Sequence, residues 1–136
     1  MVLRYANAEF GHKLDLMQKL ENLKIWVESM DLAKEVYRLL EGMPDSEKFG
    51  LTSQMKRAVV SISSCIAEGA GRNSKKDFAR FLSMANGSSF ELKTQLILST
   101  ELYFVEKDKV VDLIDKIDKI QKMNYRLQMK LSSENQ

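Results

Sequence analysis

The stretch IAEGAGRNSKKDF, residues 66–78, decides how this chain is organised. It places a Gly-x-Gly and several basic residues between two long segments of helical periodicity. Glycine commonly follows the last turn of a helix, and a serine with an acidic residue three positions later is typical of a helix N-terminus. We therefore predict the turn of a helical hairpin, in which Gly69 and Gly71 end the first helix and Ser74 caps the second.

A phosphate-binding loop is the alternative interpretation of the same glycines. Nucleotide loops of the G-x-x-x-x-G-K-[ST] and G-x-G-x-x-G types follow a β-strand and open a helix. Here the glycines follow a helical pattern, and no strand is predicted elsewhere in the sequence. The sequence therefore favours a helix stop over a nucleotide site.

The composition is that of a small all-α domain. The chain has 136 residues, of which 44% are hydrophobic and 29% charged, with one proline and eight methionines. This length suits one domain with an ordinary core. No apolar run is long enough to span a membrane, no apolar leader is visible, and the single cysteine excludes an internal disulfide. These features predict a cytoplasmic protein without a membrane partner.

Apolar residues at three- and four-residue spacing predict four helices. They cover about residues 23–41, 52–70, 75–104 and 109–131. Thr52 or Ser53 is the candidate cap of the second helix, and Asp108 that of the fourth. Helices of this length with short connections predict an all-α, antiparallel up-down four-helix bundle; a three-helix core with a peripheral hairpin is the minor alternative.

The bundle is expected to occupy residues 22–131. Residues 1–21 are interpreted as an N-terminal extension that is weakly ordered or forms a short helix, and residues 132–136 as a polar tail. The sole histidine, His12, lies in the extension, where we expect it to be solvated.

Side-chain patterns indicate how the helices pack. One face of the first helix is expected to consist of Trp26, Met30, Ala33, Tyr37 and Leu40, and the buried stripe of the second of Met55, Val59, Ile62 and Ile66. The small residues of the run 85–89 favour close approach of another backbone. On the fourth helix, three acid–base pairs four residues apart are expected on the outer side: Asp112–Lys116, Asp115–Lys119 and Asp118–Lys122.

Positive charge is concentrated in the middle of the chain. Residues 51–80 carry six basic and two acidic side chains, whereas residues 1–50 have a net charge of −2. The six cations are Lys56, Arg57, Arg72, Lys75, Lys76 and Arg80. Most of them have no acidic residue three or four positions away, so they form a candidate nucleic-acid-binding rim. A solvated basic face is the alternative.

Two further stripes are candidate contact surfaces. A polar stripe opposite the buried side of the second helix contains Ser61, Ser64 and Glu68, in line with Arg57 and Arg72. A second apolar stripe on the third helix contains Phe90, Ile97 and Phe104, spaced by seven residues. Because monomers rarely expose such patches, the apolar stripe predicts an oligomer interface; packing within the monomer is the alternative.

No catalytic chemistry is visible in the sequence. There is no Cys/His cluster for a metal, and one cysteine and one distant histidine do not form a credible nucleophile–base pair. Cys65 is expected to be a packed small residue. We therefore predict a protein that is not an enzyme and needs no metal or cofactor.

Several motifs occur in a specific order. They are Phe49-Gly50-Leu51, Ile66-Ala67-Glu68-Gly69, Gly71-Arg72, Arg80-Phe81-Leu82, Gly87-Ser88 and Thr94-Gln95-Leu96. In this order they resemble the four-helix-bundle proteins encoded by intervening sequences in bacterial 23S ribosomal RNA genes, over about residues 22–130. Ser63 and Cys65 depart from the family pattern, which often has Pro and Asn at these positions, so a role of that Asn cannot be transferred.

The resemblance implies a four-helix bundle that assembles as a homopentamer. It also points to RNA, through the ribosomal gene context and through a similar bundle that serves as the accessory protein of diversity-generating retroelements. Two hypotheses follow. The first is an oligomeric module that binds ribosomal or other structured RNA through the basic rim. The second is a protein–protein assembly module, such as an accessory subunit of a reverse transcriptase, without direct nucleic-acid binding.

Overall fold

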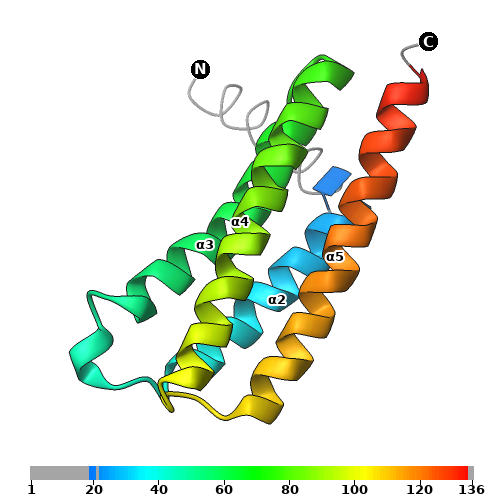
Figure 1. The fold of residues 1–136 in the computed structure, drawn as a ribbon. Coiled ribbons are helices and arrows are strands. Elements are labelled where there is room, and N and C mark those ends of the chain that lie inside the picture. Colours follow the sequence, from blue (N-terminus) through cyan, green and yellow to red (C-terminus); the bar gives the residue numbers. More distant parts are fainter. Residues whose placement is uncertain (1–18, 21, 135–136) are drawn as a thin grey trace, which may run out of the picture.

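The computed structural model describes residues 19–20 and 22–134, and within them the chain forms four long helices (Figure 1). These are α2 (Lys24–Leu40), α3 (Leu51–Ala70), α4 (Lys75–Glu101) and α5 (Lys107–Glu134); a short 3₁₀ helix, η1 (Asp45–Glu47), precedes α3. Each long helix packs against the next, and α5 closes the ring by packing against α2. The predicted all-α antiparallel four-helix fold is confirmed. The extension predicted over residues 1–21, with His12, lies almost entirely outside the described residues.

The core face of α3 agrees with the sequence pattern, whereas that of α2 agrees only at Leu40. The predicted stripe of α3, Met55, Val59, Ile62 and Ile66, is buried. On α2 the buried residues are Ile25, Ser29, Leu32, Val36 and Leu40, of which only Leu40 had been predicted. Ser29 tolerates burial because its hydroxyl donates to the Trp26 carbonyl at 2.7 Å. Because a serine does not contribute to an apolar pattern, the sequence did not indicate this buried face. Tyr37, which was predicted on the core face, is exposed.

Gly69 has a different role from the predicted helix stop. It lies within α3, no glycine in the described chain has a positive φ, and α3 ends at Gly71 with φ −81°. A Cβ at Gly69 would lie 2.7 Å from Cβ of Phe81 and 3.3 Å from the carbonyl oxygen of Phe78. The glycine therefore permits close approach of α3 and α4. In the run 85–89, where the small residues also predicted a close approach, Ala85 and Ser89 are buried, whereas Gly87 faces open space and makes no such approach.

Helix caps match the sequence at one position and differ at others. Ser74 caps α4 as predicted, with its hydroxyl accepting from the Asp77 amide at 3.0 Å. The N-cap of α3 is Gly50, and a carboxylate oxygen of Glu47 accepts from the Leu51 amide at 2.9 Å; this replaces the predicted Thr52 or Ser53 cap. A carboxylate satisfies one free N–H of the first turn and also favours the positive end of the helix dipole.

The ends of α4 and α5 also differ from the predicted ranges. α4 stops at Glu101, and Tyr103 follows with φ 61°, a conformation that is an outlier for a bulky side chain. The Tyr103 side chain is 94% exposed. α5 begins one residue before Asp108, which therefore lies in its first turn, and continues to Glu134 through most of the predicted polar tail.

Polar side chains join α4 to α5 in the interior. Asn124 is only 2% exposed, and its Nδ2 donates to the Leu82 carbonyl at 2.8 Å, while its Oδ1 accepts from Nε2 of Gln128 at 2.5 Å. One helical turn or so away, Nε2 of Gln121 donates to the Ser89 hydroxyl at 2.9 Å. We refer to these residues as the polar seam. Hydrogen bonds of the buried Asn124 and the half-buried Gln121 and Gln128 favour one register of the two helices over others.

Ion pairs connect α5 to its neighbours, and the three predicted pairs within α5 do not form. Lys116 pairs with Glu35 and Lys119 with Glu28 on α2, and Asp118 pairs with Lys93 on α4 at 2.5 Å. The acidic partners of the lysines thus come from across the helix interface. No helix in the described part of the chain combines the length and apolar character needed to cross a bilayer.

Candidate nucleic-acid interface

The turn between α3 and α4 presents a cluster of cations. Arg72, Lys75 and Lys76 are exposed there, and Arg80 follows one turn into α4. The guanidinium groups of Arg72 and Arg80 lie 5.0 Å and 4.7 Å from the centre of the buried Phe81 ring. Stacking on an aromatic ring restricts both side chains without cancelling their charge. The turn therefore holds two positioned positive charges against one ring.

Little of this charge is neutralised by acidic side chains. Arg80 Nε lies 3.7 Å from a carboxylate oxygen of Asp77, but both side chains are largely solvated, so the pair is weak. Among the described residues, Arg72 forms no ion pair with Glu68, which lies four positions before it. Lys75 has an interaction partner. Arg72 and Lys76 are consequently the clearest cations available to a ligand.

Lys56 and Arg57 do not join this cluster. They lie near the start of α3, and at 1.5 Å per residue the helix places Arg57 about 22 Å from Arg72. The Lys56 ammonium sits 5.2 Å from the centre of the Tyr37 ring on α2. The six predicted cations therefore form two separate groups, of which the group at the α3–α4 turn is the larger.

The predicted polar stripe is divided between surface and interior. Ser64 and Glu68 are exposed. Ser61 is half-buried, with its hydroxyl 2.9 Å from that of Ser88 on α4 and 3.8 Å from the sulfur of the buried Cys65. Ser61 therefore joins α3 to α4 rather than facing solvent, and Ser64 and Glu68 alone remain available for contacts.

The predicted apolar stripe contains two exposed residues instead of three. Phe90 is 53% exposed and Ile97 42% exposed on α4. Phe104 lies beyond the end of the helix and packs partly buried against the core. The seven-residue spacing predicted that all three residues lie on one helical face. Because α4 ends at Glu101, Phe104 does not lie on that face.

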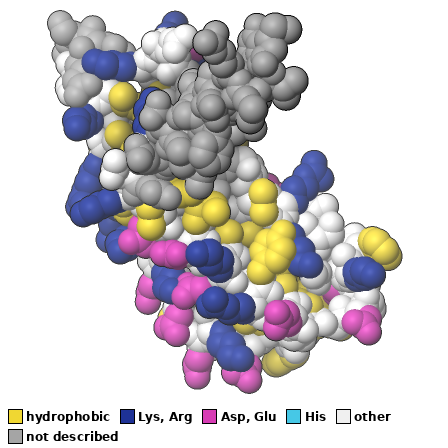
Figure 2. All heavy atoms as spheres, turned by 180° about the vertical axis from the view of Figure 1, so that it is seen from behind, with side chains coloured by type: hydrophobic (Ala, Val, Ile, Leu, Met, Phe, Trp, Pro, Cys, Tyr) yellow, Lys and Arg dark blue, Asp and Glu magenta, His cyan; other side chains and the backbone are white. Residues whose placement is uncertain are grey.

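A second basic surface, on the C-terminal half of α5, was missed from the sequence. Lys122, Arg126 and Lys130 occupy this half beyond Lys119, which is paired with Glu28, and no acidic residue occurs between residues 119 and 133. Figure 2 shows Lys and Arg side chains along this edge of the molecule, with most acidic side chains lower down. The net charge of the whole of α5 conceals this basic excess, because the acidic residues of the helix other than Glu134 all precede Lys119.

Both basic surfaces lie at one end of the bundle. Because α4 and α5 are antiparallel neighbours, the start of α4 and the end of α5 meet at that end (Figure 1). The hydrogen bonds from Asn124 to Leu82 and from Ser83 to Gln128 set this register. The end that contains the α3–α4 turn is therefore the basic end of the protein.

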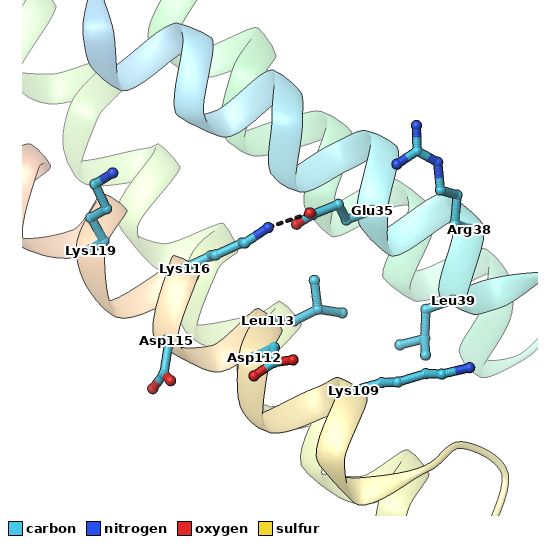
Figure 3. A pocket seen from close by; sticks show the side chains of 9 residues that line it. All are labelled: Glu35, Arg38, Leu39, Lys109, Asp112, Leu113, Asp115, Lys116 and Lys119. Atoms are coloured by element: carbon cyan, nitrogen blue, oxygen red, sulfur yellow. Dashed lines mark hydrogen bonds and ion pairs between the residues drawn. The ribbon is translucent and has the colours of Figure 1, made fainter.

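A hollow between α2 and α5 has mixed charge and is a poorer candidate. It measures about 700 Å³ between α2 and α5, and the close view in Figure 3 shows Glu35 paired with Lys116 across it. Arg38 extends away from the hollow, and Asp112 and Lys109 bring opposite charges to its edge. Its cations thus lie among carboxylates. No group of three or more potential metal ligands was found among the described residues.

Comparison with known proteins places the chain in a family. The model of the 23S rRNA-intervening sequence protein family matches residues 21–126. The chain belongs to this family. A solved structure from Bacteroides thetaiotaomicron, described as a protein with unknown function from the S23 ribosomal protein family, shares 20% sequence identity with a TM-score of 0.71.

This similarity shows that the present chain and the Bacteroides protein share one fold. The match covers 76% of the present chain and 97% of the Bacteroides chain, so nearly the whole of the solved protein has a counterpart in the helices described above. No curated protein matches the sequence. The match of the family model confirms the resemblance inferred from the ordered motifs.

Proposed function

We propose that this member of the 23S rRNA-intervening sequence protein family is a non-enzymatic, oligomeric module that binds structured RNA through its basic end. The observation that carries the proposal is the cluster at the α3–α4 turn, where Arg72 and Arg80 are held on Phe81 and Lys76 is exposed. Phosphate groups release counterions when such cations contact them, which favours binding without any sequence preference.

The second basic surface supports the same proposal. Lys122, Arg126 and Lys130 follow one another at four-residue intervals on α5, so they extend the positive surface along one side of the basic end. A single exposed cation contributes little to RNA affinity, whereas several on adjoining helices can follow a phosphate backbone. The name of the family, which refers to ribosomal RNA, agrees with a ribosomal RNA partner.

Reversing charge at the turn tests this function. We expect the double variant Arg72→Glu, Lys76→Glu to bind a fluorescein-labelled RNA hairpin at least about 10-fold more weakly at ~50 mM salt. The slope of log affinity against log salt concentration should fall by about 1–2, because each lost phosphate contact removes nearly one released counterion. Fluorescence anisotropy over a salt series measures both quantities.

A control is Lys109→Glu, a charge reversal at the opposite end of α5 that changes the net charge by two units, against four for the double variant. Its side chain is 66% exposed, so the substitution alters net charge without disturbing packing. We expect its salt slope to equal that of the unmodified protein. Absence of salt-dependent RNA binding by the unmodified protein at ~50 mM salt would contradict the proposal.

A second candidate function is assembly with other protein copies or with a partner such as a reverse transcriptase. It is favoured by the exposed apolar side chains of α4, Phe90 and Ile97, together with the strained and exposed Tyr103. A homopentamer is the assembly implied by the family resemblance. Contact between copies would remove these apolar surfaces from water.

Light scattering at micromolar concentration tests the assembly. We expect a mass that is a multiple of the 15.6 kDa chain, five-fold for a pentamer, and a smaller species for the double variant Phe90→Asp, Ile97→Asp. Val60→Asp is the control, because Val60 is also exposed but lies on α3. A mass of 15.6 kDa for the unmodified protein would rule out the assembly.

A further inference from the structure

Tyr125 is an aromatic side chain on α5 that packing does not explain. It is 65% exposed although the helix is well packed on its other side by Ile117, Ile120 and Asn124. Two hollows adjoin it. One, of about 310 Å³, lies between α4 and α5, and the other, of about 480 Å³, lies on the outer side of α5 with Lys122 and Arg126. The ring therefore forms a wall shared by two depressions of the surface.

The hollow between α4 and α5 is lined by side-chain amides in fixed positions. Asn124 and Gln128 are held by the polar seam, where they hydrogen-bond to each other, to Leu82 and to Ser83. The amides of Asn86 and Gln121 also line it, together with Ala79, Met129 and Ser132. Because hydrogen bonds within the protein set the positions of Asn124, Gln128 and Gln121, much of this wall is organised before a ligand arrives.

Some of this hydrogen-bonding capacity is unused. Within the described residues, the Asn86 side-chain amide has no hydrogen-bond partner, and Gln121 uses Nε2 toward Ser89 but has no partner for Oε1. An amide offers both a donor and an acceptor, as the edges of nucleobases require. The hollow beside Tyr125 can therefore accept a flat polar ring that stacks and forms hydrogen bonds.

Two cations that are four residues apart on α5 lie near the Tyr125 ring. Lys122 and Arg126 are exposed on the same outer side as the second hollow. Asp118 also lines the second hollow, but its carboxylate is paired with Lys93 at 2.5 Å, so its charge is largely compensated. A phosphate attached to a ring on Tyr125 would thus face positive charge.

We propose that Tyr125 is a stacking platform for an unpaired nucleobase, with Asn86 and Gln121 contacting the base edge and Lys122 and Arg126 the adjoining phosphates. This inference rests on the proposed RNA-binding function and deepens it by naming single-stranded nucleotides as the segment bound here. Bases of a duplex are stacked on one another and their edges are paired, so only unpaired nucleotides can enter. Aromatic side chains bind such bases by stacking, with little sequence preference.

The test compares a single strand that has bases with one that lacks them. A fluorescein-labelled uridine oligomer and an abasic strand of equal length and charge are titrated with the full chain at ~100 mM salt. We expect the base-bearing strand to bind about 10-fold tighter, which is the effect of stacking one or two bases. Tyr125→Ala should abolish this difference, and Tyr125→Phe should retain it.

Further readouts separate this inference from the proposed function. Because stacking releases no counterions, Tyr125→Ala should leave the salt slope and the affinity for a fully paired duplex unchanged. Equal binding of the two strands by the unmodified protein, with salt-dependent binding to both, would overturn the stacking platform but not the RNA-binding function. No binding to any RNA would overturn both.

A subunit contact at Tyr125 is the competing outcome. If Tyr125→Ala lowers the mass measured by light scattering, the ring belongs to a contact between copies, and the platform is refuted. The exposed position of Tyr125 lets the variant keep its melting temperature, so loss of binding through unfolding is recognised directly. Arg126→Glu should weaken both strands equally, because it acts on phosphates only.

Discussion

Gly69→Ala is expected to lower the free energy of unfolding by about 3 kcal/mol. The added methyl group would lie 2.7 Å from Cβ of Phe81 and 3.3 Å from the carbonyl oxygen of Phe78. Both atoms belong to or adjoin the backbone of α4, so they move only if the two helices separate. Overpacking of this kind costs about 1–3 kcal/mol in well-packed cores, and the α3–α4 contact is the most extensive in the bundle.

Urea unfolding followed by circular dichroism measures this effect, as a lower midpoint at an unchanged slope. Gly87→Ala is the matched control on α4. A Cβ there meets nothing within 4 Å, so the variant should gain up to about 1 kcal/mol from the higher helix propensity of alanine. If both variants were equally stable, the close approach at Gly69 would have no structural importance.

Asn124→Asp is expected to destabilise the protein by about 3 kcal/mol at neutral pH. The substitution preserves shape but replaces the Nδ2 donor to the Leu82 carbonyl with an oxygen, in a position that is 2% exposed. Two oxygens then face each other, and a buried charge has only Gln128 as donor. A buried polar group without its partner costs about 1–3 kcal/mol, and a charged group more.

The effect should depend on pH in a defined direction. Burial raises the pKa of the introduced carboxyl above the value of about 3.9 that it has in the unfolded chain. The folded state then retains the proton to higher pH, so the penalty is smallest below about pH 4. It grows as the pH rises from that value to the raised pKa, and it is constant above.

Unfolding free energies of the variant and the unmodified protein, compared at pH 4 and pH 7, measure this difference. Asn86→Asp is the control, because the same chemical change occurs on α4 at a half-buried side chain that has no hydrogen-bond partner within the described residues. We expect it to change stability by less than about 0.5 kcal/mol at either pH. A penalty for Asn124→Asp that did not vary with pH would contradict burial of the introduced charge.

Helical periodicity made the fold predictable, and polar core residues limited the details. Val59 and Ile66 lie on an uninterrupted apolar stripe, so the buried face of α3 followed from the sequence. Ser29 and Asn124 are buried because each finds a hydrogen bond, which a pattern of apolar residues cannot show. The function of Gly69 could not be predicted either, since a close contact depends on where Phe81 lies in space.

The candidate interface was predictable only in part. The clustering of Arg72, Lys76 and Arg80 followed from their positions around one turn. The separation of Arg57 from them depends on the length of α3, and the addition of Arg126 depends on the antiparallel pairing of α4 with α5. Spatial neighbours that are distant in sequence are not visible in local spacing.

The order in which the helices meet during folding follows from the way they are joined. α3 and α4 are connected by a short capped turn, and contacts such as Ser61 with Ser88 join residues only 27 positions apart. The ion pairs that link α2 to α5 join residues 81 and 91 positions apart. Bringing together two residues costs more entropy when the chain between them is longer. The α3–α4 hairpin should therefore form early, and the contact between α2 and α5 should form last.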